Sequence, residues 1–398
     1  MNQASSHGRP FWIGVVFFLI AAAPGCWTPS LSNILRAEGY QDWVEWIFMV
    51  PGLAGLLSPL VFAAQVDQRF QAQKVLGVIM AVGAVFLFAA FWALEAGWGI
   101  GWFASLLAIN AFISAPAWSL ITVIALNHGD DPRKTFGLFR SWGTIGWMVA
   151  GFAMSLLALD QSAKTGLVAA GLRWVAAGFC FLLPATPPKA EKAKSWVEIT
   201  GLSALGLLRD RELAFFFLTT FLFSIPLSAF YMHTPVHLAD LGVEWISGTM
   251  ACAQIVEAIA LLLMGRVLLR FRIRYILVTA LAAGVVRFGL CASNAVAGLF
   301  FSILLHGICW AFFYEAGRLF VNARVQAGVR SQAQALLGLC TGGLAGLTGI
   351  LVCRALYRGL VLHGTGGWSP YWLVLTGFTL AALVVFVLRP EPSVKQRP

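Results

Sequence analysis

The chain has 398 residues, of which 59% are hydrophobic and 11% are charged, and its net charge is +10 at pH 7. Soluble domains carry about 25% charged residues, so this composition excludes a soluble globular protein and indicates a membrane protein. The positive charge does not predict a nucleic-acid partner, because Lys and Arg gather in alternate loops along the chain, as they do in membrane proteins.

Apolar runs of about 20 residues, the length that crosses about 30 Å of hydrocarbon, centre near residues 22, 54, 83, 112, 147, 173, 225, 257, 284, 308, 344 and 379. Because the runs are long and continuous, they favour helices over the alternating strands of a β-barrel. We therefore expect an all-α membrane protein with twelve transmembrane helices. The first run, from Phe11, extends past Trp27 without a clear cleavage site, so we expect a span and not a signal peptide.

The basic residues predict how these spans are oriented. One set of loops holds most of them, and the other set holds little beyond Arg36, Lys164, Arg354 and Arg358. By the positive-inside rule we expect both termini in the cytoplasm and a multi-pass protein of the cytoplasmic (inner) membrane.

The fifth run contains "FRSWGTIGWMVAGF", which places Arg140, Thr144 and Trp147 on one face of a helix. A charge near the bilayer centre costs about 2.5 to 3.5 kcal/mol, so an arginine there needs a partner or a function. A guanidinium, a hydroxyl and an indole together predict one wall of a binding pocket. Glycines in the same run allow close helix contact: Gly143, Gly146 and Gly151. In the sixth run, we expect Arg173 to reach the membrane surface and assign it no function.

Between the sixth and seventh runs lies the longest polar stretch, "PATPPKAEKAKSWVEITGLSALGLLRDRE". Its Pro and Lys content predicts a cytoplasmic linker at residues 184–212, between a six-helix half at 1–183 and another at 213–398. Apolar residues in the linker recur at helical spacing and predict a short helix on the inner membrane surface: Trp196, Ile199, Leu202 and Leu205.

The eighth run carries an acid, Glu257, about 18 Å into a layer of about 30 Å. Gln254 lies one turn earlier on the same face, and small residues flank both. Burial favours the protonated form of a carboxyl, so such an acid can take up and release a proton when its surroundings change. The alternative is a structural ion pair with Arg287 in the ninth run.

In the tenth run, His306, Trp310 and Tyr314 follow one another at a spacing of four residues and predict a stripe of rings. Such a stripe either packs the helix or forms a wall that stacks on a flat ligand. Glu315 and Arg318, three residues apart, predict a local salt bridge or a gate.

Two echoes relate the halves to each other. "VEWI" begins at Val44 and again at Val243, and "RF" begins at Arg69 and again at Arg270. In both halves a glycine lies thirteen residues after the phenylalanine of this pair, at Gly83 and at Gly284. Echoes at matching places favour a duplicated unit. Two six-helix halves joined by a linker resemble the major facilitator superfamily, whose substrate site lies between the halves. The segment "AAQVDQRFQAQK" also resembles that superfamily's loop signature, with Ala63 in place of its usual leading glycine.

No cluster of nucleophile, base and orienting group occurs in the sequence, nor does a phosphate-binding loop, so we do not expect an enzyme. The seven cysteines lie in apolar segments without metal-ligand spacing, so we expect neither a metal nor another cofactor.

The segment "FRSWGTIGW" closely resembles the span-five motif of the nucleoside:proton symporter family, a branch of the same superfamily. Further segments resemble that family in the same order: "INAFISAPAWSLITV", "SWVEITGLSALGLLRDRELAFFF", "AQIVEAI", "VVRFGL", "HGICWAFFYEAGRLFV" and "VRSQAQALLGL". The resemblance spans nearly the whole chain and implies uptake of nucleosides driven by a proton gradient.

The resemblance and the patterns above give a set of predicted solute contacts: Arg140, Thr144, Trp147, Gln254, Glu257, Trp310 and Tyr314. Glu257 is the predicted proton-coupling acid, with Glu315 as a second. We expect a monomer in the lipid bilayer that takes a small-molecule substrate and no nucleic acid.

This chain departs from the family at three positions. The family's glutamine and asparagine on span seven fall on Pro226 and Ala229, and its aspartate on span ten falls on Ala311. Nearby groups partly replace them: Ser224, Ser228, Tyr231, His233 and, for the acid, Glu315. The losses leave open a proton symporter of another polar solute, such as a sugar or a nucleoside-like metabolite. A receptor that senses a solute without moving it is disfavoured by the lack of a long cytoplasmic signalling domain.

Overall fold

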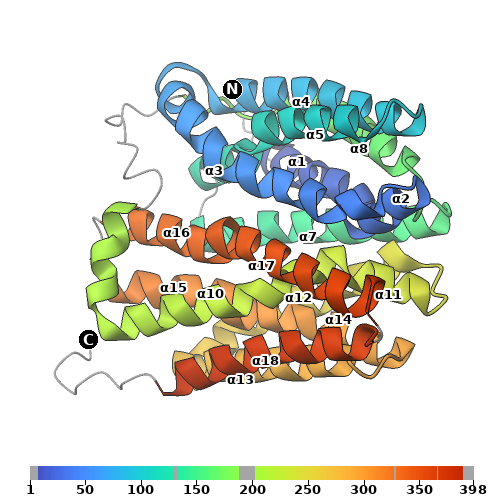
Figure 1. The fold of residues 1–398 in the computed structure, drawn as a ribbon. Helices are drawn as coiled ribbons and strands as arrows, with labels where there is room; N and C mark the ends of the chain where they lie inside the picture. The colour runs from blue at the N-terminus through green and yellow to red at the C-terminus, as the bar shows by residue number, and fades with distance from the viewer. Residues whose placement is uncertain (1–7, 129–131, 188–201, 327–328, 365, 389–398) are drawn as a thin grey trace. The chain divides into compact units, whose positions relative to one another are not determined.

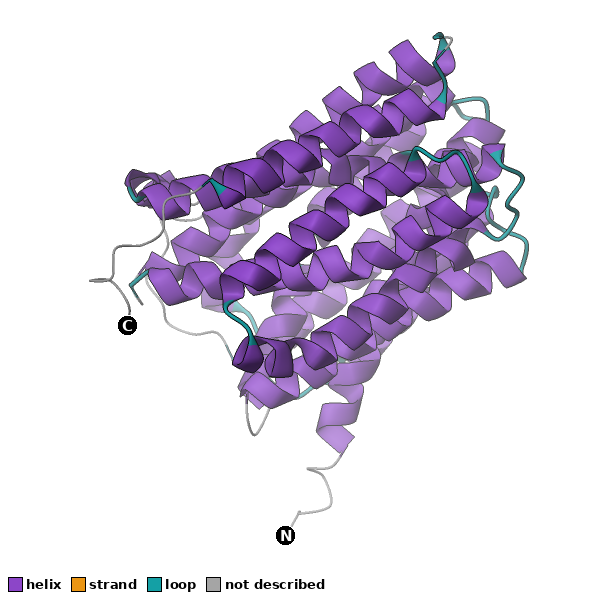
Figure 2. Ribbon diagram, turned by 90° about the horizontal axis from the view of Figure 1, so that it is seen from below, coloured by secondary structure: helices purple, strands orange, loops and turns teal. Residues whose placement is uncertain are grey.

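The computed structural model describes residues 8–128, 132–187, 202–326, 329–364 and 366–388, and within these ranges the chain is helical without strands (Figures 1 and 2). The helices before the predicted linker are α1 (Gly8–Trp27), α2 (Leu31–Ala37), α3 (Val44–Arg69), α4 (Ala72–Glu95), α5 (Ile100–Ser114), α6 (Ala117–His128), α7 (Pro132–Leu156) and α8 (Lys164–Cys180). Those after it are α10 (Arg211–Met232), α11 (Thr234–Asp240), α12 (Ile246–Arg270), α13 (Ile273–Cys291), α14 (Val296–Cys309), α15 (Ala316–Arg324), α16 (Arg330–Gly338), α17 (Leu344–Leu356) and α18 (Trp368–Val387).

Nine helical stretches of the described chain are long and apolar enough to cross a membrane. All of the expected span centres, from residue 22 to residue 379, fall inside helices. The expectation of an all-α membrane protein is therefore confirmed, because continuous apolar runs satisfy their backbone hydrogen bonds within the helix.

The chain folds into two compact units. Unit 1 comprises Met1–Lys194 with Val243–Gln254, and unit 2 comprises Ser195–Gly242 with Ile255–Pro398. In unit 1, α1 packs against α7 and α8, and α4 packs against α5 and α8. In unit 2, α10 packs against α17 and α18, and α13 packs against α14 and α18. Counted by span, each pair in unit 1 has a counterpart in unit 2, the relation expected of a duplicated unit.

The sequence echoes fall at corresponding places in this pattern. Helices α3 and α12 both end at the arginine of the "RF" pair, Arg69 and Arg270. The paired glycines are buried at helix contacts: a Cβ on Gly83 would lie 2.7 Å from a side-chain oxygen of α5, and one on Gly284 would overlap the ring of Phe223. A side chain larger than hydrogen is therefore excluded at the same place in both units.

A second close approach joins α1 to α7 within unit 1. A Cβ on Gly146 would overlap the backbone carbonyl of Phe18, and one on Gly25 would lie 3.0 Å from the backbone of Trp147. The glycines of span five thus serve the close helix contact that their spacing predicts.

Arg173 differs from the expectation that it reaches the membrane surface. Its side chain is only 8% exposed and donates hydrogen bonds to Asn110 Oδ1, at 2.7 Å, and to Ser114 Oγ. Ser114 is the last residue of α5, where a turn at Ala115 and Pro116 separates α5 from α6. A helix carries partial negative charge at its C-terminus, so the interrupted span offers a buried cation a favourable place.

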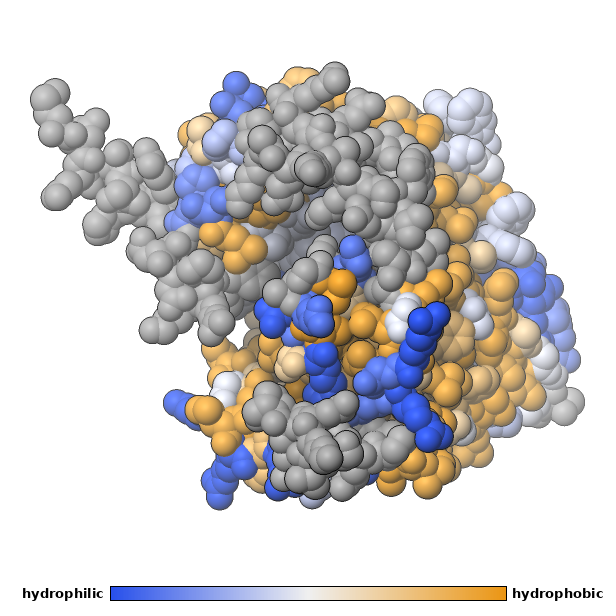
Figure 3. Space-filling model, turned by 90° about the vertical axis from the view of Figure 1, so that its left-hand side faces the viewer, coloured by the Kyte–Doolittle hydropathy of each residue, from blue (hydrophilic) through white to orange (hydrophobic). Residues whose placement is uncertain are grey.

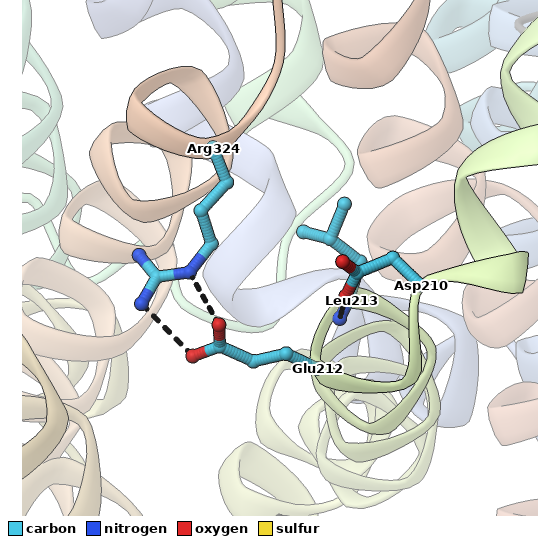
Figure 4. Close-up of polar contacts among 4 residues, drawn as sticks. All are labelled: Asp210, Glu212, Leu213 and Arg324. Carbon is cyan, nitrogen blue, oxygen red and sulfur yellow. Dashed lines mark hydrogen bonds and ion pairs between the residues drawn. The ribbon is translucent and has the colours of Figure 1, made fainter. Parts of the chain in front are cut away.

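The start of α10 is fixed by two polar contacts (Figure 4). Asp210 caps the helix by accepting a hydrogen bond from the Leu213 amide at 3.0 Å. Arg324 at the end of α15 donates to both carboxylate oxygens of Glu212, at 2.8 and 2.9 Å. These contacts tie the first turn of α10 to α15 inside unit 2. Figure 3 shows the side of the molecule that lies on the left in Figure 1, where hydrophilic residues lie beside hydrophobic surface.

Part of the predicted linker helix lies outside the described residues, including Trp196 and Ile199. Its last part, Leu202–Arg209, forms a 3₁₀-helix that leads into α10. The side chains of Asp67 and Arg69 in the predicted loop signature also lie outside the described part of the chain.

A buried histidine, His237, links three parts of unit 2 by hydrogen bonds. His237 on α11 accepts a hydrogen bond at Nδ1 from Trp372 Nε1, at 2.9 Å, so its proton is on Nε2. That nitrogen donates to Asn294 Oδ1, at 2.7 Å, in the turn between α13 and α14. Asn294 adopts a positive φ of 52°, which is uncommon for a residue other than glycine. The three side chains thus connect α11, the turn after α13 and α18.

Candidate functional site

Span five, now α7, brings two of its three predicted side chains together. Arg140 Nη1 donates to the Thr144 hydroxyl at 3.4 Å, and Thr144 is buried. The Arg140 guanidinium also lies 5.0 Å from the ring centre of Trp118 on α6. An indole face stabilises a cation without occupying its N–H groups. Arg140 and Thr144, expected on one face of the helix, are in contact, and their role in solute binding stays a prediction. Trp118 is not predicted, because no sequence spacing relates α6 to α7.

Gln254 and Glu257 on α12 both point into protein, with exposed fractions of 6% and 4%. The alternative of an ion pair between Glu257 and Arg287 is not observed among the described residues. Arg287 instead lies with its guanidinium 4.6 Å from the ring centre of Phe230 and 4.7 Å from that of Phe288. Among the described residues, the printed neighbours of Arg287 are therefore aromatic rings and not the acid that the sequence offered as its partner.

The first turn of α12 is held by side chains of unit 1. The Ser247 amide donates to Asp160 Oδ1 and the Gly248 amide donates to Ser155 Oγ, each at 2.8 Å. First-turn amides have no partner within their own helix, so these contacts satisfy two of them and hold this first turn within unit 1. The sequence gives no signal for this cap, because its acceptors are far from α12 along the chain.

Unit 2 contains the predicted ring stripe. The ring centres of His306 and Trp310 are 6.1 Å apart, and those of Trp310 and Tyr314 are 5.1 Å apart. The Tyr314 hydroxyl lies 3.2 Å from Ser224 Oγ on α10. The stripe crosses from α14 into a π-helical segment, η4 (Trp310–Glu315). A π-helix is rare in proteins, and where one occurs it is often at a functional site.

A small cavity beside this stripe has a volume of about 30 Å³, enough for one or two water molecules and far below that of a nucleoside. Its lining comes from α10, η4 and α15–α16 and from a second π-helical segment, η6 (Leu339–Gly343). Its residues are Phe216, Thr220, Trp310, Phe313, Tyr314, Arg318, Leu337 and Thr341. This cavity alone does not hold a solute of nucleoside size.

The predicted local salt bridge is confirmed. Arg318 Nε lies 3.6 Å from the Glu315 carboxylate, and the two side chains are 54% and 32% exposed. An exposed pair of this kind contributes about 0 to 1 kcal/mol to stability.

The three positions that depart from the family are buried. Ala311 packs in an apolar cluster with Ala260 and Met264 of α12, on the turns that follow Glu257. Pro226 and Ala229 are buried within α10. The side chains at Pro226, Ala229 and Ala311 therefore offer no hydrogen-bonding group to a solute beside Glu257.

The hydroxyls expected to replace the lost groups are used within unit 2. Ser224 donates to the Thr220 carbonyl at 2.7 Å, and Ser228 donates to the Gly346 carbonyl at 3.3 Å. His233 contacts the hydroxyl of Tyr371 through Nδ1. The Ser224 contact lies within α10, whereas those of Ser228 and His233 join different helices. Each of these side chains therefore already uses part of its hydrogen-bonding capacity within the protein.

Comparison with known proteins places this arrangement in a family. The sequence model described as "Nucleoside H+ symporter" matches residues 10–393. The chain belongs to this family. It is 30% identical to YegT of Escherichia coli (strain K12), over 87% of this chain and 86% of that protein. It is 25% identical to the nucleoside permease NupG of the same organism, over 94% of each chain.

Solved structures agree on the fold. The crystal structure of NupG matches with a TM-score of 0.81 at 24% identity, over 97% of this chain and 98% of that one. The D-xylose–proton symporter matches with a TM-score of 0.74 at 13% identity, over 98% of this chain and 99% of that one. These structures show that the chain has the fold of those transporters. The match to the symporter family confirms the predicted family and shows a transporter.

Proposed function

We propose that this protein takes up nucleosides together with protons across the cytoplasmic membrane by alternating access. Membership of the nucleoside H+ symporter family supports the substrate class and the coupling ion. The observation that carries the mechanism is Glu257, an acid that is only 4% exposed in the middle of a membrane-spanning helix. An acid inside the membrane costs free energy, so its presence there indicates a function.

Glu257 is the coupling acid in this proposal. It binds a proton when wetted from outside and releases it when wetted from inside. One charge moved inward yields about 2.3 kcal/mol per 100 mV of membrane potential. This corresponds to an accumulation of about 40-fold, because every 1.4 kcal/mol is a factor of ten.

The predicted contacts divide by chemistry. Arg140, Thr144 and Gln254 supply hydrogen bonds to the sugar and base of the solute. Trp147, with Trp310 or Tyr314, stacks on the base, because an aromatic face matches the π-face of a nucleobase.

Alternating access needs two bodies that move against each other. We assign these to the six-helix halves at 1–183 and 213–398, joined by the cytoplasmic linker at 184–212, with both termini in the cytoplasm and twelve spans in all. The proton gradient alone drives the cycle without a cofactor, and the protein works as a monomer.

The test is uptake of labelled uridine into proteoliposomes with an imposed proton gradient. Glu257→Gln is expected to abolish uphill uptake while exchange of internal for external uridine persists, because the amide binds solute but carries no titratable proton. Glu315→Gln is the matched control on the other predicted acid. Gradient-driven accumulation by Glu257→Gln at the level of the parent protein would rule out Glu257 as the coupling acid.

A second candidate is a proton symporter of another polar solute, favoured by the apolar residues at Pro226, Ala229 and Ala311 and by the engaged hydroxyls of Ser224 and Ser228. Competition of uridine uptake by adenosine and by simple sugars separates the two. Competition by sugars but not by adenosine would favour the second candidate.

A further inference from the structure

Arg287 begins a continuous stack of rings that ends at the predicted solute contacts. Phe230 on α10 lies under the Arg287 guanidinium and stacks on His306 of α14, with ring centres 4.0 Å apart and planes 9° from parallel. His306 stacks on Trp310, and Trp310 contacts Tyr314. The order from α13 is therefore Arg287, Phe230, His306, Trp310 and Tyr314.

The guanidinium is the unusual member of this stack. Arg287 is almost completely buried, and among the described residues it makes no ion pair with a carboxylate. Its Nε has no hydrogen-bond partner. The guanidinium lies against the faces of Phe230 and Phe288, which attract a cation, and a cation–π contact is strongest where water is excluded. A buried charge kept without an acid calls for a function that an apolar side chain would not serve.

We propose that Arg287 is a positioning residue for solute binding: by holding Phe230 it orients His306 and thereby Trp310, the ring expected to stack on the base. The inference rests on the proposed function and adds a residue to it that touches no solute. Removing the charge frees Phe230 and His306, so Trp310 samples several orientations. Solute affinity then falls, while the steps that move the loaded protein are unaffected.

The two rings around Arg287 provide a matched pair of variants. They lie at nearly equal distances from the guanidinium, 4.6 Å for Phe230 and 4.7 Å for Phe288, and both are buried. Only Phe230 continues to His306, whereas Phe288 stacks on Trp372 at the other side. Phe230→Leu and Phe288→Leu therefore remove the same contact with Arg287 but differ in their connection to Trp310.

The experiment measures KM and maximal rate of proton-driven uridine uptake, with thermal unfolding of each purified variant. Phe230→Leu and Arg287→Met are expected to raise KM about 30-fold, the factor that corresponds to a desolvated cation–π contact, with an unchanged maximal rate. Phe288→Leu is expected to leave KM within about twofold. Arg287→Lys, which keeps the charge, is expected to restore most of the affinity.

Unfolding separates positioning from loss of structure. Replacing a buried charge by an apolar side chain of similar volume is often neutral or stabilising, so Arg287→Met is expected to unfold no earlier than the parent. Equal rises of KM in Phe230→Leu and Phe288→Leu, or a normal KM in both Phe230→Leu and Arg287→Met, would overturn the inference alone. A parent protein that accumulates no nucleoside would instead refute the proposed function.

Discussion

Arg140, Arg173 and Arg287 show how single charged residues are accommodated inside the helices. None pairs with a carboxylate in the described chain: Arg140 uses an indole and a hydroxyl, Arg173 an amide and a hydroxyl, and Arg287 two phenyl rings. The sequence identifies such residues as costly, but it cannot supply their partners, because these come from other helices. For this reason Arg173 was expected at the surface, whereas its partners keep it buried.

At the same scale, Gly146 provides a steric test. Gly146→Ala places a methyl group on the backbone of Phe18, which α1 can avoid only by moving away from α7. We expect a loss of about 1 to 3 kcal/mol of stability, measured by thermal unfolding of the purified protein. Gly178→Ala on α8 is the control, since a Cβ there meets no atom within 4 Å. That change is expected to be neutral or to stabilise by up to about 1 kcal/mol. Equal unfolding midpoints for the two variants would contradict the steric explanation.

At the scale of elements, the apolar runs place the helices well but do not reveal where helices change form. The break after Ser114 contains Pro116 and η6 contains Gly342 and Gly343, signals that hydrophobic periodicity does not use, whereas η4 is as apolar as the helix before it. Their geometry depends on neighbouring helices, so periodicity misses it. The expected placement of Arg140 with Thr144 on one face and the expected salt bridge of Glu315 with Arg318 are found, because a spacing of three or four residues determines them.

The connection formed by His237 predicts how stability depends on pH. Burial lowers the pKa of His237 below 6.5, against the opposing effects of the Asn294 hydrogen bond and the Asp240 charge. The neutral ring is also required by geometry, since Nδ1 accepts from Trp372. The unfolded chain then binds more protons, so stability is complete above about pH 6.5 and falls as pH drops toward the lower pKa of the folded protein.

The measurement is the thermal unfolding midpoint between about pH 7.5 and pH 5, with His237→Gln as the control. The parent is expected to lose about 1.4 kcal/mol for each unit by which the pKa is lowered. The glutamine variant, which has no titratable ring at this position, is expected to show a flatter profile. Parallel profiles for the two proteins would show that His237 does not cause the change.

At the scale of the whole molecule, the sequence predicts the fold better than the site. The repeated pairing of helices in the two units agrees with the echoes at Arg69 and Arg270 and with the family match over residues 10–393. A fold follows from a pattern that runs through the whole chain. The solute contacts depend on a few side chains from separate helices, and their predicted roles stay predictions.

The distribution of Lys and Arg predicts the orientation of the whole chain. A fusion of alkaline phosphatase after the turn at Gly97 is expected to be active, because its disulfides form only outside the cytoplasm. The same fusion at the C-terminus is expected to be inactive, whereas a fluorescent protein fused there should fluoresce. The reverse pattern would place the C-terminus outside the cell.

The contact of α1 with α7 at Gly146 also bears on leakage. Where a methyl group does not fit between two backbones, a water molecule of similar size does not fit either. Water is therefore excluded at the point where Gly146 meets the backbone of Phe18. For a carrier driven by a proton gradient, each such dry contact is one place less where protons could pass without solute.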